Sequence, residues 1–175
     1  MKNIFIRDAG IIKEKTNKKY FEKKEFFFRL KNAIYLARKF KIHLQLTISK
    51  DFFLKHLNIF NSYKPKLKKI KFITVHLHAN YDSLISNDEK SILFIKKLNK
   101  FSKDLANVIG YCVHPDNVES YEVVAKLKNK KSYLAIEVTD LKSKSGNSFK
   151  QINLLLNKYK YLGLVLDTSH IKDIK

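Results

Sequence analysis

Glycine, proline and cysteine are scarce in this sequence, and tryptophan is absent. With four glycines and two prolines, the chain is neither collagen-like nor a low-complexity linker. The single cysteine, Cys112, excludes an internal disulfide and is typical of a reducing compartment. Because Cys112 lies in an apolar run, we expect it to be a buried structural thiol. No apolar stretch approaches the ~20 residues of a membrane helix, and the N-terminus lacks the apolar core of a signal peptide, so we expect a soluble cytoplasmic protein.

Acidic residues are also few relative to basic ones. Lys and Arg number 36 against 16 Asp and Glu, which gives a net charge of +20. Such an excess favours a polyanionic partner such as nucleic acid, or an anionic membrane surface. The alternative is a lysine-rich composition without a specific partner, because the lysines are spread along the whole chain.

What the sequence does contain is a regular alternation of strand and helix patterns. Strands are predicted at residues 3–7, 43–48, 70–78, 108–113, 133–138 and 162–166. Helices are predicted at about 21–40, 51–60, 118–128, from a cap at Asn87 or Asp88 to about 105, and from a cap at Asn147 or Ser148 to about 157. Residues 63–69, around Pro65, are predicted to be a basic loop. The alternation indicates βα units and a parallel sheet.

The expected architecture is therefore an α/β, TIM-type barrel with about six parallel strands, in a single domain over residues 1–175. A complete barrel has eight strands and typically about 250 residues. We thus expect an incomplete barrel. Either a C-terminal segment is missing, or a second chain completes the site, or the chain is an inactive remnant.

Side chains that bind metals recur where four of the predicted strands end. They are His76 and His78, then His114, then Glu137, and finally Asp167 with His170. In a parallel barrel all these strand ends open on one face, so residues far apart in sequence converge there. Imidazole and carboxylate groups suit Zn²⁺, Mn²⁺ or Fe²⁺, and a carboxylate can bridge two ions that activate water beside a phosphodiester.

Each of these residues taken alone is more often structural, and the prediction rests on their joint occurrence. His76 and His78 lie on the same strand face and compete for one role, and we favour His78 because it is nearer the strand end. His43 and His56 are expected to be structural or exposed.

Four short motifs carry a resemblance to a known family. They are His78-Ala79-Asn80-Tyr81, Val113-His114-Pro115, Ala135-Ile136-Glu137 and, most specific of all, Leu164-Val165-Leu166-Asp167-Thr168-Ser169-His170. In order and spacing they resemble the motifs of the endonuclease IV family, the apurinic/apyrimidinic endonucleases within the xylose-isomerase-like TIM-barrel superfamily. The resemblance extends from about residue 27 to residue 170.

The resemblance implies a three-zinc enzyme of base excision repair that cleaves DNA on the 5′ side of an abasic site. By position, His78 and His114 would bind one zinc ion, and Glu137 would bridge that ion to a second one as the catalytic carboxylate. Asp167 would bind the second zinc ion and His170 a third. DNA would be the partner, and its binding would depend strongly on salt.

Tyr81 matches a family tyrosine that enters the DNA at the lesion, and the alternative is an ordinary loop tyrosine. The chain also departs from the family pattern. Asp116 replaces a glycine, Val138 replaces an asparagine, and the ligands that the family carries after the sixth strand have no counterpart before Lys175.

Two other functions remain open from the sequence. One is a sugar or sugar-phosphate isomerase or epimerase of the same superfamily, which would use one divalent ion such as manganese or magnesium. The other is a non-catalytic nucleic-acid-binding remnant. The combination of His78, His114 and His170 favours the nuclease, since a one-metal site does not need them all.

Overall fold

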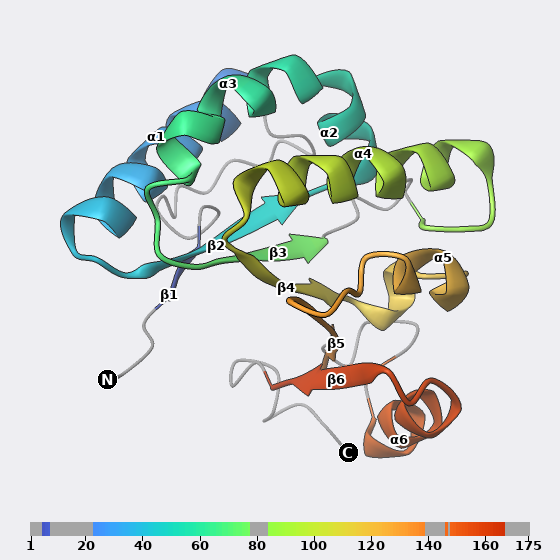
Figure 1. The fold of residues 1–175 in the computed structure, drawn as a ribbon. Helices are drawn as coiled ribbons and strands as arrows, with labels where there is room; N and C mark the ends of the chain where they lie inside the picture. Colours follow the sequence, from blue (N-terminus) through green and yellow to red (C-terminus); the bar gives the residue numbers. More distant parts are fainter. Residues whose placement is uncertain (1–4, 8–22, 78–83, 139–145, 147, 167–175) are drawn as a thin grey trace.

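The computed structural model describes residues 5–7, 23–77, 84–138, 146 and 148–166, and within them strands and helices alternate (Figure 1). The strands are β1 (Phe5–Arg7), β2 (His43–Ile48), β3 (Ile73–Leu77), β4 (Val108–Val113), β5 (Tyr133–Glu137) and β6 (Leu162–Val165). The helices are α1 (Lys23–Lys39), α2 (Lys50–Lys55), α3 (Leu57–Leu67), α4 (Glu89–Leu105), α5 (Tyr121–Ala125) and α6 (Phe149–Lys158), and a 3₁₀ turn, η2 (Pro115–Asn117), follows β4.

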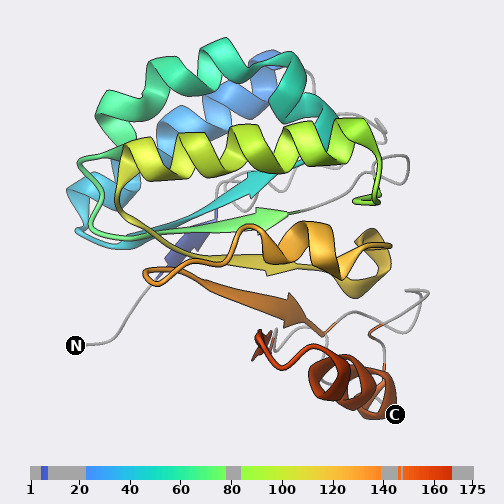
Figure 2. The same cartoon turned by 45° about the vertical axis from the view of Figure 1, so that its right-hand side comes forward.

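The six strands form one sheet in the order β1-β2-β3-β4-β5-β6, and each neighbouring pair is parallel. Right-handed crossovers between consecutive strands place all the helices on the same side of a sheet. Figures 1 and 2 show this arrangement, with α1–α4 over the sheet and α5 and α6 continuing around its outer side. The strand order does not reverse, as it would in a doubly wound sheet. The predicted α/β class and parallel sheet are confirmed, whereas the incomplete TIM-type barrel stays a prediction.

The core lies between the sheet and its helices. Helix α4 illustrates why, because Phe94, Leu98, Phe101 and Leu105 recur at helical spacing and are all nearly fully buried. Burying each such side chain contributes roughly 1.5–3 kcal/mol. The lysines of α4 occupy the opposite, exposed face. In the part of the chain that the structure describes, no helix has both the length and the apolar character needed to cross a bilayer.

Helix α3 corrects one prediction from the sequence. Residues 63–69 were predicted to be a loop because of Pro65, but α3 continues through this proline to Leu67. Phe60 and Leu67, two turns apart, are both fully buried, and their packing holds the helix together. Pro65 lies in the last turn of α3. The backbone hydrogen bond that it removes therefore interrupts the helix only near its end.

Helix α4 begins at the cap that the sequence predicted, with Asp88 chosen over Asn87. The Asp88 carboxylate accepts hydrogen bonds from the Ser91 backbone N–H at 2.7 Å, from the Ser91 hydroxyl at 2.8 Å, and from the Ser86 hydroxyl. These three donors hold the pKa of Asp88 well below its ordinary value. The cap therefore stabilises the start of the helix that covers β3 and β4.

Replacement of this cap tests its contribution to stability. We expect Asp88→Ala to lower the free energy of unfolding by about 1 kcal/mol, and Asp88→Asn, which keeps an accepting oxygen, to lower it by less. Because folding lowers the pKa, the contribution of Asp88 is fully present above pH 3.8, its ordinary pKa, and is lost as the pH falls below it. Urea unfolding at pH 7 and pH 3 measures both effects. An equal loss for Asp88→Ala at the two pH values would contradict the assignment.

Candidate metal centre

The face of the sheet that points away from the helices carries a row of polar and small residues. Side chains alternate between the two faces of a strand, so His76 on β3 points away from the apolar core to which Val75 and Leu77 belong. In the sheet register His76 lies beside Cys112, and Cys112 lies beside Ala135. Glu137 follows two residues after Ala135 and therefore points to the same side. The small side chain of Ala135 leaves room for the longer groups around it.

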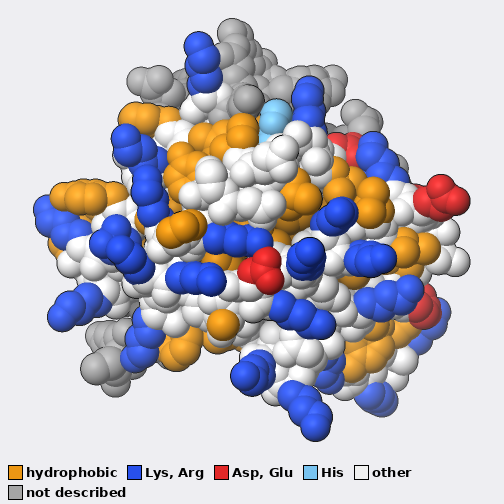
Figure 3. All heavy atoms as spheres, turned by 45° about the horizontal axis from the view of Figure 1, so that its top comes forward, with side chains coloured by type: hydrophobic (Ala, Val, Ile, Leu, Met, Phe, Trp, Pro, Cys, Tyr) orange, Lys and Arg blue, Asp and Glu red, His pale blue; other side chains and the backbone are white. Residues whose placement is uncertain are grey.

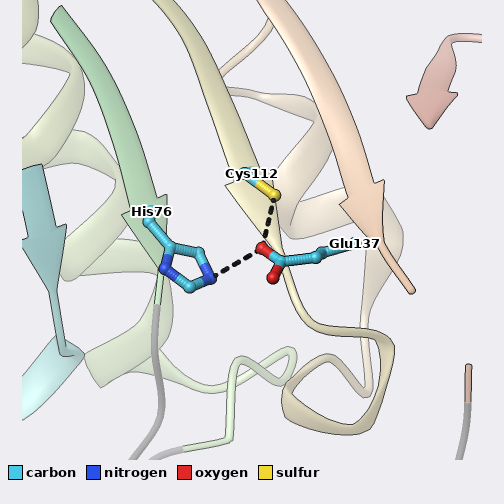
Figure 4. Close-up of side chains that lie close together, drawn as sticks. All are labelled: His76, Cys112 and Glu137. Atoms are coloured by element: carbon cyan, nitrogen blue, oxygen red, sulfur yellow. Dashed lines mark hydrogen bonds and ion pairs between the residues drawn. The ribbon is translucent and has the colours of Figure 1, made fainter. Parts of the chain in front are cut away.

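The side chains of His76 and Cys112 converge on one carboxylate oxygen of Glu137 (Figure 4). The Nε2 atom of His76 lies 3.2 Å from Oε2 of Glu137, and the Cys112 thiol donates a hydrogen bond to the same oxygen at 3.4 Å. His114 approaches from the end of β4, with its Nε2 atom 3.8 Å from Oε2 of Glu137. The imidazole rings of His76 and His114 are 4.8 Å apart. All four residues come from the carboxyl-terminal halves or ends of three adjacent parallel strands.

The centre is largely shielded from solvent. The His76 side chain is fully buried and that of Glu137 is 5% exposed, whereas the His114 side chain is 17% exposed. Burial alone would raise the pKa of Glu137, but the close approach of the His76 and His114 imidazoles and the hydrogen bond from the Cys112 thiol together lower it to about 2. Glu137 is therefore an ionised carboxylate at neutral pH, which is the form that binds a metal ion.

The spacing of the donor atoms suits a divalent ion. His76, Cys112 and Glu137 each offer one ligand atom, and these atoms lie within 4.8 Å of one another. Zinc bonds of roughly 2.0–2.3 Å in a tetrahedral site place neighbouring ligand atoms about 3.3–3.8 Å apart. The contacts of His76 and Cys112 with Glu137, at 3.2 and 3.4 Å, are close to that spacing. These residues could hold a metal ion without a large rearrangement of the strands.

A glycine packs beneath the loop that carries His114. Gly146 has a φ of +77°, and a Cβ atom there would lie 2.5 Å from the Pro115 ring. Such a backbone conformation is accessible mainly to glycine. Since Pro115 directly follows His114, a larger side chain at position 146 would displace the backbone next to this imidazole.

We expect Gly146→Ala to lower the free energy of unfolding by about 1–3 kcal/mol, because it adds both backbone strain and a clash with Pro115. Displacement of the loop should also weaken metal binding through His114. Gly163→Ala is the matched control, since its nearest neighbour, the Cβ atom of Ala135, would be 3.6 Å away, an ordinary contact. Urea unfolding of the two variants should differ clearly, and equal midpoints would refute the role of Gly146.

The structure brings together two of the residues predicted from the sequence, His114 and Glu137. Four other predicted residues lie outside the described residues and stay predictions: His78, Tyr81, Asp167 and His170. His76, to which the sequence argument preferred His78, lies in the centre. His43 begins β2, is buried, and stacks on Phe72.

Cys112 is the residue that sequence reasoning missed. It is buried, as predicted, but it also contacts Glu137, so its role is not only to fill the core. The available signal was its position two residues before His114, which places both side chains on the same face of β4. The missing information was the register that aligns Cys112 with His76.

A groove of about 530 Å³ lies on the helical side of the sheet, beside α4. Its lining includes Lys96, Lys100, Lys103 and Lys126. It is on the other side of the sheet from the metal centre and contributes no ligand to it. Figure 3 shows that the lysines and arginines of this helical surface greatly outnumber its acidic side chains.

The chain was compared with models of known protein families, with curated proteins and with solved structures, and it matches none of them. The case for a function therefore rests on the geometry of the centre, the charge of the chain and the motifs in its sequence.

Proposed function

We propose that the protein is a metal-dependent phosphodiesterase of the endonuclease IV type, which cleaves DNA on the 5′ side of abasic sites in base excision repair. One observation carries the proposal. His114 and Glu137 come from two separate motifs of the resemblance, and their side chains meet, with Nε2 of His114 3.8 Å from Oε2 of Glu137. His76 is a third side chain that can bind a metal ion, and it contacts the same Glu137 oxygen. The resemblance does not predict this contact, so the structure adds it as independent support for a metal site.

The proposed site has a defined role for each of these side chains. His114 and His76 would bind metal through Nε2, and the ionised Glu137 carboxylate would bridge two ions. Asp167 and His170, from the next strand end, are proposed to complete the set, with His78 as a further ligand. Bound divalent ions supply an activated water and neutralise charge on the phosphodiester. The burial of Glu137 strengthens its electrostatic interactions with cations.

The charge of the chain supports a polyanionic substrate. A net charge of +20 creates a positive potential that draws DNA to the protein. Sugar phosphates are small anions that need no such extended surface, so the charge favours the nuclease over the isomerase. It does not distinguish a nuclease from a nucleic-acid-binding remnant, and only turnover does so.

The test combines metal content with cleavage. We expect the purified chain to bind two or more zinc ions and to nick a duplex with a single abasic site, but not the intact duplex. A single manganese or magnesium ion with isomerase activity would instead favour the sugar enzyme. DNA binding without metal and without nicking would leave the remnant.

A further inference from the structure

The thiol of Cys112 has no part in the set of ligands that the resemblance implies, yet it lies in the centre of the site. Its Sγ atom is 3.4 Å from Oε2 of Glu137 and lies within 4.8 Å of a ring nitrogen of His76. Cys112 is paired in register with His76, so both side chains lie one layer deeper in the sheet than His114. The depth difference along β4 is two residues, or roughly 6–7 Å.

Together with Glu137, whose side chain lies at the strand end, this deeper pair makes a donor set that differs chemically from the one that the resemblance implies. His76, Cys112 and Glu137 together offer one nitrogen, one sulfur and one oxygen from three adjacent strands. A soft sulfur ligand favours zinc, whereas magnesium and manganese favour sites made of oxygen. Three protein ligands also leave a fourth position of a tetrahedral ion open for water.

We propose that Cys112 is a direct ligand of a metal ion held by His76, Cys112 and Glu137, and that its thiolate makes this centre selective for zinc over magnesium and manganese. The inference rests on the proposed function only in assuming that the centre binds metal. In the metal-free protein the Cys112 thiol donates its proton in a hydrogen bond to Glu137. When the ion binds, this proton is released to solvent and the resulting thiolate bonds to the ion, without any change of oxidation state.

Cobalt(II) gives a direct test, because it occupies zinc sites and because a cobalt–thiolate bond produces a charge-transfer band in the near ultraviolet. Cys112 is the only cysteine in the sequence, so such a band can arise from no other residue. We expect the wild-type chain titrated with cobalt to develop this band, with saturation at one thiolate-bound ion per chain. The measurement needs no variant and therefore does not depend on whether a variant folds.

Two variants extend the test. Cys112→Ser keeps a hydroxyl that can donate to Glu137 but removes the sulfur, so the band should disappear. Zinc affinity, measured by equilibrium dialysis, should fall at least about tenfold, while manganese affinity should change little. Cys112→Ala separates the loss of the sulfur from any effect of the hydroxyl. Circular dichroism melting curves verify that both variants are folded.

The outcomes distinguish this inference from the proposed function. Cobalt that binds to the wild-type chain, and is lost in Glu137→Gln, but gives no charge-transfer band would overturn the role of Cys112 and leave a metal-dependent enzyme in place. Equal loss of zinc and manganese affinity in Cys112→Ser would overturn the selectivity. Absence of any bound metal in the wild-type chain would overturn the proposed function itself.

Discussion

Glu137→Gln is expected to abolish metal-dependent cleavage and to lower zinc affinity by at least about a hundredfold. The amide has the same shape as the carboxylate but no charge, and it cannot bridge two cations. Glu137 is also the shared contact of His76, Cys112 and His114, so no other described side chain can replace it. Equilibrium dialysis with zinc and the rate of nicking of an abasic duplex measure the two losses.

A matched control excludes a general effect of removing one negative charge. Glu122 is an exposed residue of α5, on the helical side of the sheet, and Glu122→Gln should leave zinc binding and cleavage unchanged. His114→Ala should lower the metal content while the fold stays largely intact, because this side chain lies at a strand end rather than in the core. If Glu137→Gln retained full zinc binding and cleavage, the catalytic centre would have to lie elsewhere in the chain.

The fold was largely predictable because each element carries its own local signal. β2 alternates apolar and polar residues, and α4 combines a four-residue apolar spacing with an Asp88 cap, so neither needs tertiary information. The failure at α3 has the opposite cause. Pro65 is a strong local signal for a loop, and it is overridden by the burial of Phe60 and Leu67, which only the packed structure reveals.

The site was predictable only as far as topology determines it. Parallel strands bring their carboxyl ends to one edge whatever their separation in sequence, so His114 and Glu137 could be placed together in advance. The depth of a residue below that edge depends on where each strand ends and on the register with its neighbour. β3 ends at Leu77 and aligns His76 with Cys112, and neither fact can be read from an alternating pattern.

Binding of the protein to abasic DNA is expected to weaken about a thousandfold or more between 50 and 200 mM salt. The net charge of +20 provides more than the six or so cationic contacts to phosphate that such a dependence requires, because each contact releases a counterion from the DNA. The measurement uses fluorescence anisotropy with the Glu137→Gln variant, so that the duplex stays intact during the titration.

The comparison of abasic with intact duplex at each salt concentration decides what this charge is for. Phosphate contacts are the same for both duplexes, so a site that reads the lesion keeps a preference for abasic DNA as salt rises and the non-specific part of the affinity falls. A lysine-rich surface without such a site would bind the two duplexes equally at every salt concentration. That result would reject DNA repair as the function, and a flat salt dependence would reject nucleic acid as the partner.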